Sequence, residues 1–390
     1  MVLSVSGLTK TYHTSHGDVQ ASKQLSFDLN EGEVLALVGP SGCGKTTALR
    51  CVAGLEEPDG GTITIGEDTL YSSERGVAVT PENRPVGMVF QSYAIWPHMT
   101  VFQNVAYPQV VSRPKPSSPV IKERVGDALE RVRISELAGR RATMLSGGQQ
   151  QRVAIARALV RGARVLLFDE PLSNLDAKLR EEMRGELRTL FKSMGATVLY
   201  VTHDLGEALA ISDRVIVLES GSIAQEGTPD EIYFNPASVF VAEFLGNANL
   251  IDAHASPAGD KIRVASHVAT VHLPAQDAPG AKGDVTMLIR PEAFTLTPAQ
   301  QHEASAVVEA TMFLGSVVEY QMRTNNGQSL TARMPSYGDR HRAGTLVKID
   351  VDPAGVSLIR PAEPDTIALP EAKTGIDGHD LDQEVEPEVA

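Results

Sequence analysis

The amino-acid sequence predicts an α/β domain with a mostly parallel sheet, followed by a small all-β barrel. Up to about residue 235, short apolar runs rich in β-branched residues alternate with helical patterns, which favours parallel strands covered on both faces. Beyond about residue 245, strand-like runs are divided by Gly, Pro, Asn and Asp, which is typical of a barrel or sandwich. A chain of 390 residues is also long enough for two or more domains.

The strands of the first domain are predicted at VLALV, VLLFD, TVLYVT and RVIVL, and its helices at residues 45–54, 177–194 and 204–212. The second of these helices has a clear core face, because apolar side chains recur at helical spacing at Leu179, Met183, Leu187, Leu190 and Met194. Gly195 is predicted to end it. A Pro/Ser-rich surface loop at residues 112–119 leads to another helix that begins near Val120.

The strands of the second domain are predicted at KIRVA, VATVHL, DVTMLIR, SVVEYQMR, SLTARM and TLVKIDV. From about residue 363 the chain is acidic and has few apolar residues to bury, so this tail is predicted to be disordered. The predicted organisation is a first domain at residues 1–240, a β domain at 245–362 and a tail at 363–390.

The composition argues against several classes of protein. A hydrophobic content of 42% with 22% charged residues is that of a water-soluble globular protein. No run approaches the ~18 uncharged apolar residues of a membrane span, and the N-terminus lacks the apolar segment of a signal peptide. The two cysteines, Cys43 and Cys51, are too few for a disulfide framework and fit a reducing cytosol. A formal net charge of −14 argues against general nucleic-acid binding.

The stretch GPSGCGKTT follows the VLALV strand and precedes a predicted helix. In this context the pattern G-x-x-x-x-G-K-[ST] predicts a loop whose backbone N–H groups bind the phosphates of a nucleotide. Lys45 is expected to reach the β- and γ-phosphates, and the Thr46 hydroxyl to be a ligand of Mg²⁺. The alternative is a glycine-rich turn with a chance lysine. The residues predicted to contact the nucleotide are Gly39, Pro40, Ser41, Gly42, Cys43, Gly44, Lys45, Thr46 and Thr47.

The stretch VLLFDE, residues 165–170, places two carboxylates at the end of an apolar strand. Asp169 is positioned to support Mg²⁺, and Glu170 is a candidate general base for the attack of water. An apolar run followed by two acids is common by itself, and the preceding phosphate loop favours the functional interpretation. Together the two segments predict ATP hydrolysis.

Between these segments, LSGGQ at Leu145 to Gln149 resembles the signature motif of the ABC-transporter ATPases. Other motifs of that family are present: Gln91 in VFQSYAIWPHMT resembles the Q-loop, SNLD at 173–176 the D-loop, and His203 in TVLYVTHD the switch histidine. Tyr12 is at the position of the aromatic residue that stacks on adenine. The resemblance covers roughly residues 1–240 and implies a P-loop ABC ATPase domain with a helical subdomain at about 92–160.

The resemblance implies ATP and Mg²⁺ as cofactors. The implied catalytic residues are Lys45, Glu170 and His203, and the implied metal ligands are Thr46, Gln91 and Asp169. Outside the loop, the implied contacts of ATP are Tyr12, Gln91, Ser146, Gly147, Gly148, Gln149, Asp169 and Asp176. Three of the implied site residues also fit a role without nucleotide chemistry. His203 fits a structural histidine, Gln91 a polar surface residue and Tyr12 a packed aromatic.

Ser146, Gly147 and Gly148 begin a predicted helix, where free N–H groups and a hydroxyl form an anion site. One chain does not need two phosphate sites for a single nucleotide. In the family, this second site serves the ATP of a partner in a head-to-tail pair. The single set of motifs therefore implies a homodimer, or a pair with a homologous ATPase subunit.

Two uses of such an ATPase remain open: a subunit of a membrane transporter, or a soluble ABC ATPase of the DNA-repair or translation type. The soluble type is expected to show a long coiled-coil insertion or two tandem nucleotide domains, and neither pattern is present in the sequence. LIRPE at 288–292 resembles a hallmark of the TOBE domain, an OB-like regulatory barrel of importer ATPases. The resemblance therefore favours an importer.

An importer ATPase of this kind is expected on the cytoplasmic face of the inner membrane, as a peripheral protein. Its implied partners are transmembrane permease subunits and, indirectly, an extracytoplasmic solute-binding protein. The stretch QSYAIWPHMTVFQNVAYP is most similar to the ferric-iron, polyamine and aminoethylphosphonate importers, with the maltose type as the alternative. Because other subunits bind the cargo, no residue of this chain is expected to contact it.

Overall fold

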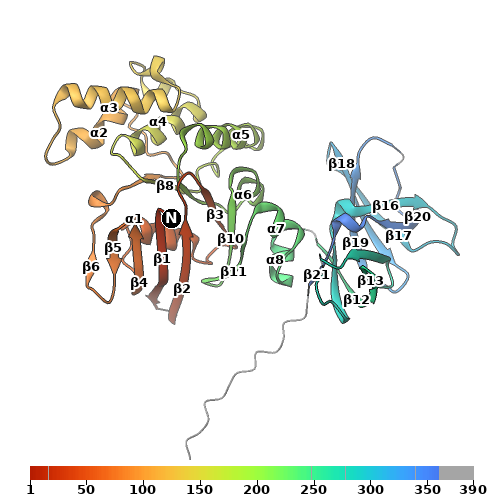
Figure 1. Cartoon of the computed structure of the whole chain (residues 1–390). Coiled ribbons are helices and arrows are strands. Elements are labelled where there is room, and N and C mark those ends of the chain that lie inside the picture. Colours follow the sequence, from red (N-terminus) through yellow and green to blue (C-terminus); the bar gives the residue numbers. More distant parts are fainter. Residues whose placement is uncertain (16, 247, 277, 339, 360–390) are drawn as a thin grey trace, which may run out of the picture. The chain divides into compact units, whose positions relative to one another are not determined.

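The computed structural model in Figure 1 describes residues 1–15, 17–246, 248–276, 278–338 and 340–359. The predicted disorder of the tail at 363–390 lies outside these residues. The N-terminal part contains two sheets and a group of helices, and the part that follows α8 consists of strands, as the change of sequence texture near residue 245 predicts.

A six-stranded sheet forms the centre of the N-terminal part. Its order is β11 (Ser222–Gly227), β10 (Arg214–Glu219), β3 (Val34–Val38), β9 (Val198–Val201), β8 (Val165–Asp169) and β7 (Val86–Val89). Neighbouring strands are parallel, except that β10 and β11 are antiparallel. Every side chain of β3 and β9 is buried, as expected for parallel strands that are covered on both faces. The four predicted strands of this domain are β3, β8, β9 and β10.

A second sheet is antiparallel, and the sequence pattern did not predict it. Its order is β2 (Gly17–Leu29), β1 (Leu3–Thr14), β4 (Gly60–Ile65), β5 (Asp68–Ser72) and β6 (Val77–Ala78). The pairing of β1 with β2 shifts register at several places, which interrupts the alternation of apolar and polar residues by which a strand is recognised. The predicted mostly parallel sheet is therefore the central sheet alone.

The helix α1 (Lys45–Ala53) packs between the two sheets. Its side chains Leu49 and Val52 are completely buried in one core with Leu8 of β1 and Leu37 of β3. The strand β3 therefore leads through the loop at residues 39–44 directly into a helix whose position is fixed from both sides.

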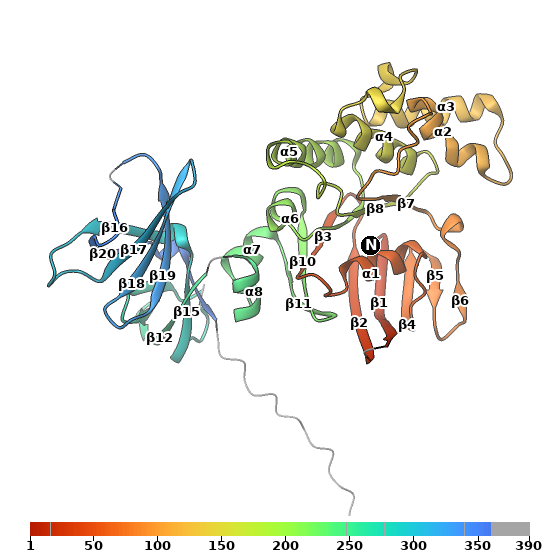
Figure 2. The ribbon, with the colours of Figure 1, turned by 180° about the vertical axis from the view of Figure 1, so that it is seen from behind.

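The helices α2 (Val101–Val111), α3 (Ser118–Arg131) and α4 (Gly147–Leu159) form a group that lies across the central sheet from β2 and β4 in both Figure 1 and Figure 2. Two short 3₁₀ helices, η2 (Ser135–Leu137) and η3 (Ala142–Met144), connect α3 to α4, and η1 (Pro81–Asn83) precedes β7. A capping box between Thr100 and Gln103 begins α2. Side chains of this group share one core with α5.

The helix α5 (Ala177–Met194) has the bounds that the sequence predicts, and Gly195 ends it in the left-handed conformation with φ of 56°. Met183, Leu187 and Leu190 are buried, while Leu179 and Met194 are partly buried at the edge of the core. Phe191 is also buried, so the apolar face is wider than the predicted stripe.

Three helices, α6 (Leu205–Ile211), α7 (Pro229–Phe234) and α8 (Val239–Phe244), pack on the central sheet near β3 and β10. Val241 and Leu245 belong to the same apolar cluster as Val38 of β3 and Val215 of β10. The predicted end of the first domain, residue 240, lies inside α8. Because the residues after it still pack on the sheet, we propose that the first domain extends to Gly246.

The C-terminal part contains two antiparallel five-stranded sheets. One has the order β14 (Thr270–Pro274), β13 (Lys261–Ala265), β12 (Asn249–Ala258), β15 (Gly283–Ile289) and β21 (Val356–Ile359). The other has the order β16 (Phe294–Pro298), β20 (Leu346–Val351), β17 (Ala306–Phe313), β18 (Val317–Thr324) and β19 (Ser329–Pro335), and η4 (Pro291–Ala293) and η5 (Pro353–Gly355) are short 3₁₀ turns. Side chains from both sheets share one core, which agrees with the predicted small β domain.

Candidate functional site

Three adjacent strands bring the predicted phosphate loop and the predicted catalytic residues to one edge of the central sheet. Leu37 of β3 is paired with Val201 of β9, and Val201 with Asp169 of β8. Because the strands are parallel, the residues that follow them emerge at the same level: the loop after β3, Glu170 after β8 and His203 after β9. The register of the sheet therefore assembles the site.

The loop at residues 39–44 depends on two of its glycines for steric reasons. A Cβ on Gly39 would lie 2.4 Å from the Leu218 carbonyl oxygen, and one on Gly44 would lie 2.0 Å from the Ala21 carbonyl oxygen. Gly44 also has φ of 100°, a conformation that favours glycine, and it is the N-cap residue immediately before α1. The loop thus lies against neighbouring backbone at both ends, and its form is fixed.

Lys45 is almost completely buried at the start of α1. Its ammonium group donates hydrogen bonds to the carbonyl oxygens of Gly39 at 2.8 Å and Pro40 at 2.9 Å. Cys43, which the sequence placed among the nucleotide contacts, is buried, with its Sγ 3.7 Å from the same ammonium. The positive charge therefore lies within the curve of the loop, where a phosphate would be bound.

Thr46 and Asp169 meet beside this loop. The Thr46 hydroxyl donates to Asp169 Oδ1 at 3.3 Å. Partial burial raises the pKa of the Asp169 carboxyl, while the charge of Arg50 and the Thr46 hydrogen bond act in the opposite direction. A hydroxyl and a carboxylate this close provide hard oxygen ligands of the type that Mg²⁺ prefers.

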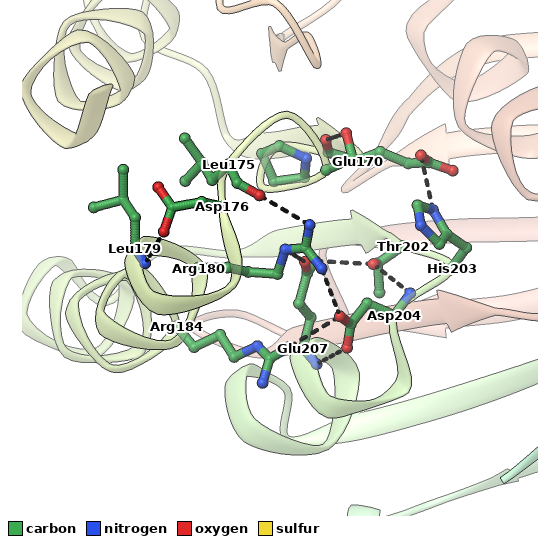
Figure 3. Close-up of polar contacts among 12 residues, drawn as sticks. Glu170, Leu175, Asp176, Leu179, Arg180, Arg184, Thr202, His203, Asp204 and Glu207 are labelled. Atoms are coloured by element: carbon green, nitrogen blue, oxygen red, sulfur yellow. Dashed lines mark hydrogen bonds and ion pairs between the residues drawn. The ribbon is translucent and has the colours of Figure 1, made fainter. Parts of the chain in front are cut away.

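Glu170 and His203 are in direct contact (Figure 3), with Glu170 Oε2 and His203 Nδ1 separated by 2.9 Å. Glu170 has φ of 47°, a left-handed backbone that is strained for a residue with a side chain. Its N–H donates to the Val201 carbonyl, and its own carbonyl accepts from the Ser173 hydroxyl. The surrounding hydrogen bonds therefore hold the carboxylate in this orientation.

Two further predicted nucleotide contacts, Tyr12 and Gln91, lie in different surroundings. Tyr12 is on β1, and its hydroxyl is 3.5 Å from the Thr47 hydroxyl, which places the ring beside the start of α1. Gln91 follows β7 and has an exposed side chain, whose amide donates to the Asn174 side chain at 3.2 Å. Asn174 returns a hydrogen bond to the Gln91 carbonyl at 3.3 Å. The predicted Q-loop and D-loop thus contact each other directly.

The signature residues lie apart from the phosphate loop of their own chain. Ser146 begins α4 through a reciprocal capping box with Gln149, and Gly147 and Gly148 form the first turn of that helix. Figure 1 shows α4 in the helical group, away from α1. A Cβ added to Gly148 would lie 2.7 Å from Met183 Sδ, so the first turn of α4 packs closely against α5. Tyr12 and Asp169 thus contact residues beside the loop, and Glu170 and His203 emerge at the same sheet edge. The hydrogen bonds of Gln91, Asp176 and the signature residues lie elsewhere.

Asp176, the last residue of the predicted D-loop, begins α5 by accepting a hydrogen bond from the Leu179 N–H at 3.0 Å. Beyond it lies a polar network that the sequence analysis missed, formed by Arg180, Arg184, Asp204 and Glu207 (Figure 3). One signal of this network was visible in the sequence. Asp204 and Glu207 have the spacing of a helix-capping pair, and the arginines are four residues apart on one helix face.

A phosphate loop after a buried strand, with acidic residues after neighbouring parallel strands, defines a P-loop nucleotide-binding domain. The chain matches the family model of the ABC transporter over residues 22–173 and that of the TOBE domain over residues 287–359. Among solved structures, cbiO1 from Clostridium perfringens, part of the ABC transporter complex cbiONQ, is 32% identical with a TM-score of 0.51. That match covers 59% of this chain and 90% of cbiO1.

The chain is also similar to several import proteins. It is 42% identical over 342 residues to the spermidine/putrescine import ATP-binding protein PotA of Pseudomonas aeruginosa, covering 86% of this chain and 91% of that protein. It is 43% identical over 349 residues to the Fe(3+) ions import ATP-binding protein FbpC 1 of Rhizobium meliloti, covering 88% and 94%. It is 49% identical over 239 residues to the trehalose/maltose import ATP-binding protein MalK of Thermococcus litoralis, covering 61% and 64%.

The chain therefore belongs to the ATP-binding subunits of ABC importers that carry a C-terminal TOBE domain, and it is an ABC-type ATPase. Both expectations from the sequence, the ATPase class and the importer type, are confirmed. None of the helices in the described residues combines the length and the apolar character needed to cross a bilayer.

Proposed function

We propose that this protein hydrolyses ATP on the cytoplasmic face of the inner membrane to drive the import of a polyamine or of ferric iron, with aminoethylphosphonate as a further candidate. The observation that carries the proposal is the register of β3, β9 and β8, which places Lys45, Asp169 and the Glu170–His203 pair at one sheet edge. The named cargoes of the relatives supply the substrate class. A maltose-type sugar is the alternative, supported by the likeness to MalK.

The phosphates of ATP would be bound by the backbone N–H groups of residues 39–44 and by the Lys45 ammonium. Lys45 is already held within the loop by two carbonyl oxygens, so binding would exchange these acceptors for phosphate oxygens. The Tyr12 ring, whose hydroxyl lies 3.5 Å from the Thr47 hydroxyl, would stack on the adenine. Mg²⁺ would be held by Thr46 and Asp169, with Gln91 completing the protein ligands, and would neutralise charge on the phosphates.

Hydrolysis needs a group that orients and deprotonates water. Glu170 is suited to this task, because its strained backbone and its contact with His203 fix the carboxylate beside the end of β8. The imidazole of His203 is roughly half exposed, so the face that does not contact Glu170 remains accessible to a γ-phosphate. His203 would therefore keep the base and the γ-phosphate at fixed positions relative to each other.

A second subunit would complete each ATP site. The N–H groups at the start of α4 and the hydroxyl of Ser146 form an anion site, and it lies away from the phosphate loop of the same chain. Two chains arranged head to tail would each present this site to the γ-phosphate held by the other. We propose a homodimer or a pair with a homologous subunit, and Asp176 would lie near the same interface.

The permease would dock on the surface formed by Gln91 and residues 92–107. The side chain of Tyr107 is exposed there, and it lines a cavity of about 700 Å³. Its apolar lining is formed by Met99, Phe102, Ala106, Tyr107, Val110 and Ile121. An apolar hollow in this surface fits a cytoplasmic segment of a membrane protein, which would sense the nucleotide site through Gln91.

Reconstitution tests this proposal and its alternatives together. The full chain is combined with its cognate permease in liposomes, and phosphate release is measured with the solute-binding protein loaded with spermidine, putrescine, Fe³⁺, 2-aminoethylphosphonate or maltose. We expect one of the first four to stimulate hydrolysis, and the Glu170→Gln variant to abolish both hydrolysis and uptake. Stimulation by maltose alone would favour the sugar importer. Stimulation by DNA or ribosomes without the permease would instead indicate the soluble class of ABC ATPase.

A further inference from the structure

Arg180 joins two segments that flank the candidate catalytic residues. It lies in the first turn of α5, and its Nη2 donates to the Leu175 carbonyl oxygen at 3.0 Å. Its Nη1 donates to Asp204 Oδ2 at 3.4 Å, and Figure 3 shows the guanidinium between the two acceptors. Leu175 belongs to the SNLD segment, residues 173–176, and Asp204 follows His203 directly. One side chain therefore connects SNLD to the loop that carries His203.

Asp204 is fixed by more than this contact. Its other carboxylate oxygen accepts from the Glu207 N–H at 3.1 Å and so begins α6, while Arg184 donates to Oδ2 at 2.9 Å. The Asp204 N–H donates to the Thr202 hydroxyl at 2.9 Å. Both residues that flank His203 are thereby held, and a displacement of Asp204 would move the imidazole with it.

The network also reaches the interior of the domain. Glu207 is almost completely buried and accepts hydrogen bonds from the hydroxyls of Thr202 at 2.8 Å and Tyr200 at 3.0 Å. The Nε of Arg180 lies 4.0 Å from the other oxygen of Glu207. Two arginines thus face two carboxylates across α5 and α6, and the charges balance.

These contacts close a ring around the candidate site. SNLD is attached to Glu170 at one end, because the Ser173 hydroxyl donates to the Glu170 carbonyl at 2.8 Å. At its other end, the Leu175 carbonyl is bound by Arg180, which pairs with Asp204. His203 then completes the ring through its 2.9 Å contact with Glu170. A movement of SNLD would be transmitted to Glu170 and to His203 by separate routes.

We propose that Arg180 is a positioning residue for ATP hydrolysis, which couples the position of SNLD to the orientation of His203 and hence to its contact with Glu170. The inference rests on the proposed roles of Glu170 and His203. Its chemical basis is the planar guanidinium, which can donate to a carbonyl and a carboxylate at the same time, whereas a lysine ammonium of the same charge would reach only one of these acceptors with comparable geometry.

Arg188 offers a matched control on the same helix. Its Nη1 donates to the carbonyl oxygens of Ile211 at 2.9 Å and Ser212 at 3.0 Å, at the opposite end of α6. It therefore also joins α5 to α6 by hydrogen bonds to carbonyl oxygens, but it contacts neither SNLD nor the residues beside His203. Arg188→Ala therefore measures how much stability is lost when hydrogen bonds between α5 and the end of α6 are removed without a change beside His203.

The test compares wild type, Arg180→Ala, Arg180→Lys and Arg188→Ala as full chains, with thermal unfolding, ATP affinity and steady-state kcat and KM measured for each. Misplaced catalytic groups lower the rate steeply, so we expect both Arg180 variants to lose about 10- to 100-fold in kcat, with ATP affinity and KM nearly unchanged. Arg188→Ala is expected to keep the wild-type kcat. Because Arg180→Lys keeps the positive charge, it distinguishes the effect of two simultaneous hydrogen bonds from the effect of an ion pair alone.

Three results would overturn the inference. They are a normal kcat in Arg180→Ala, recovery of the wild-type kcat in Arg180→Lys, or an equal loss of kcat in Arg188→Ala. A parallel measurement on Glu170→Gln distinguishes this failure from failure of the proposed site. If Glu170→Gln is inactive while Arg180→Ala has a normal kcat, Glu170 is retained as the candidate base and the coupling through Arg180 is rejected. If Glu170→Gln hydrolyses ATP normally, the site assignment itself is wrong.

Discussion

The imidazole Nδ1 of His203 lies 2.9 Å from the carboxylate Oε2 of Glu170, although the two residues are 33 positions apart in sequence. They meet because β8 and β9 are neighbouring parallel strands and each residue comes shortly after its strand ends. The carboxylate is only about a quarter exposed, whereas the imidazole is about half exposed. Glu170 is therefore the more restricted partner, which fits a base that must keep one orientation.

Substitution of Glu170 by Gln tests the base directly. The amide keeps the shape and a polar contact with His203 but cannot accept a proton, so we expect hydrolysis to fall by about 10²–10⁴-fold while ATP binding survives. Phosphate release and a sizing column with Mg-ATP measure the two effects. If the ATP-bound pair forms as proposed, the variant should show more dimer than wild type, and ADP should abolish the difference.

The exposed Glu181 on α5 supplies a charge-matched control for this experiment. Glu181→Gln is expected to hydrolyse ATP at the wild-type rate and to form no additional dimer. Near-normal turnover in Glu170→Gln would move the role of the base to another group, with His203 the next candidate.

Substitution of Lys45 by Ala removes the charge within the phosphate loop. A lost charge-assisted hydrogen bond costs about 1.5–3 kcal/mol, so ATP affinity should fall by about 10- to 100-fold, and turnover with it. The carbonyls of Gly39 and Pro40 each also lose one donor, although Pro40 keeps the Cys43 N–H, so we expect a small decrease in unfolding temperature. Nucleotide titration and thermal unfolding measure these effects, with the exposed Lys23→Ala as control. Wild-type affinity in Lys45→Ala would contradict the loop assignment.

Two glycines of the loop should respond differently to alanine. Gly44 and Gly42 both have positive φ, 100° and 83°, so each substitution carries a backbone cost of about 1–2 kcal/mol. Only at Gly44 would the new Cβ also meet another atom, the Ala21 carbonyl oxygen at 2.0 Å, while the space at Gly42 is open. We therefore expect Gly44→Ala to lose more stability and more ATP affinity than Gly42→Ala. If both variants lost the same free energy of unfolding in denaturant, the contact with the Ala21 carbonyl would have no effect on stability.

The phosphate loop, the VLLFDE strand and the helix of residues 177–194 could be predicted because each depends on residues close together in sequence. A loop needs its glycines, a buried strand needs a short apolar run, and a helix needs its 3.6-residue spacing. The side-by-side placement of Glu170 and His203 required the order and register of β8 and β9, which no local pattern contains. The family resemblance supplied that step.

The antiparallel sheet and the Arg180 network were missed for a different reason. Register shifts between β1 and β2 remove the regular alternation, so β1 has a weak local signal. Arg180 looks like one of several arginines on an exposed helix face until α6 is placed beside α5. Contacts between side chains on separate helices depend on packing, which the sequence alone does not reveal.

The position of the domain boundary can be tested with two truncations. Fragment 1–246 keeps Val241 and Leu245, which are buried against the sheet, while fragment 1–240 lacks both. Full burial of such a side chain contributes about 1.5–3 kcal/mol, so fragment 1–240 should unfold at a clearly lower temperature. Fragment 1–246 should bind ATP like the full chain but form a weaker dimer. Equal unfolding temperatures, or loss of ATP binding in fragment 1–246, would contradict the proposed boundary.

The buried Glu207 should make stability depend on pH. Burial raises the pKa of its carboxyl, against the hydrogen bonds from Thr202 and Tyr200. The native state therefore binds the proton more tightly than the unfolded chain, whose glutamate pKa is about 4.3, and wild-type stability should fall as pH rises from there through the folded pKa. Glu207→Gln cannot ionise, so its unfolding temperature relative to wild type should rise over this window and then level off. A difference that stays constant from pH 4 to pH 8 would mean that Glu207 ionises in the folded protein as readily as in the unfolded chain.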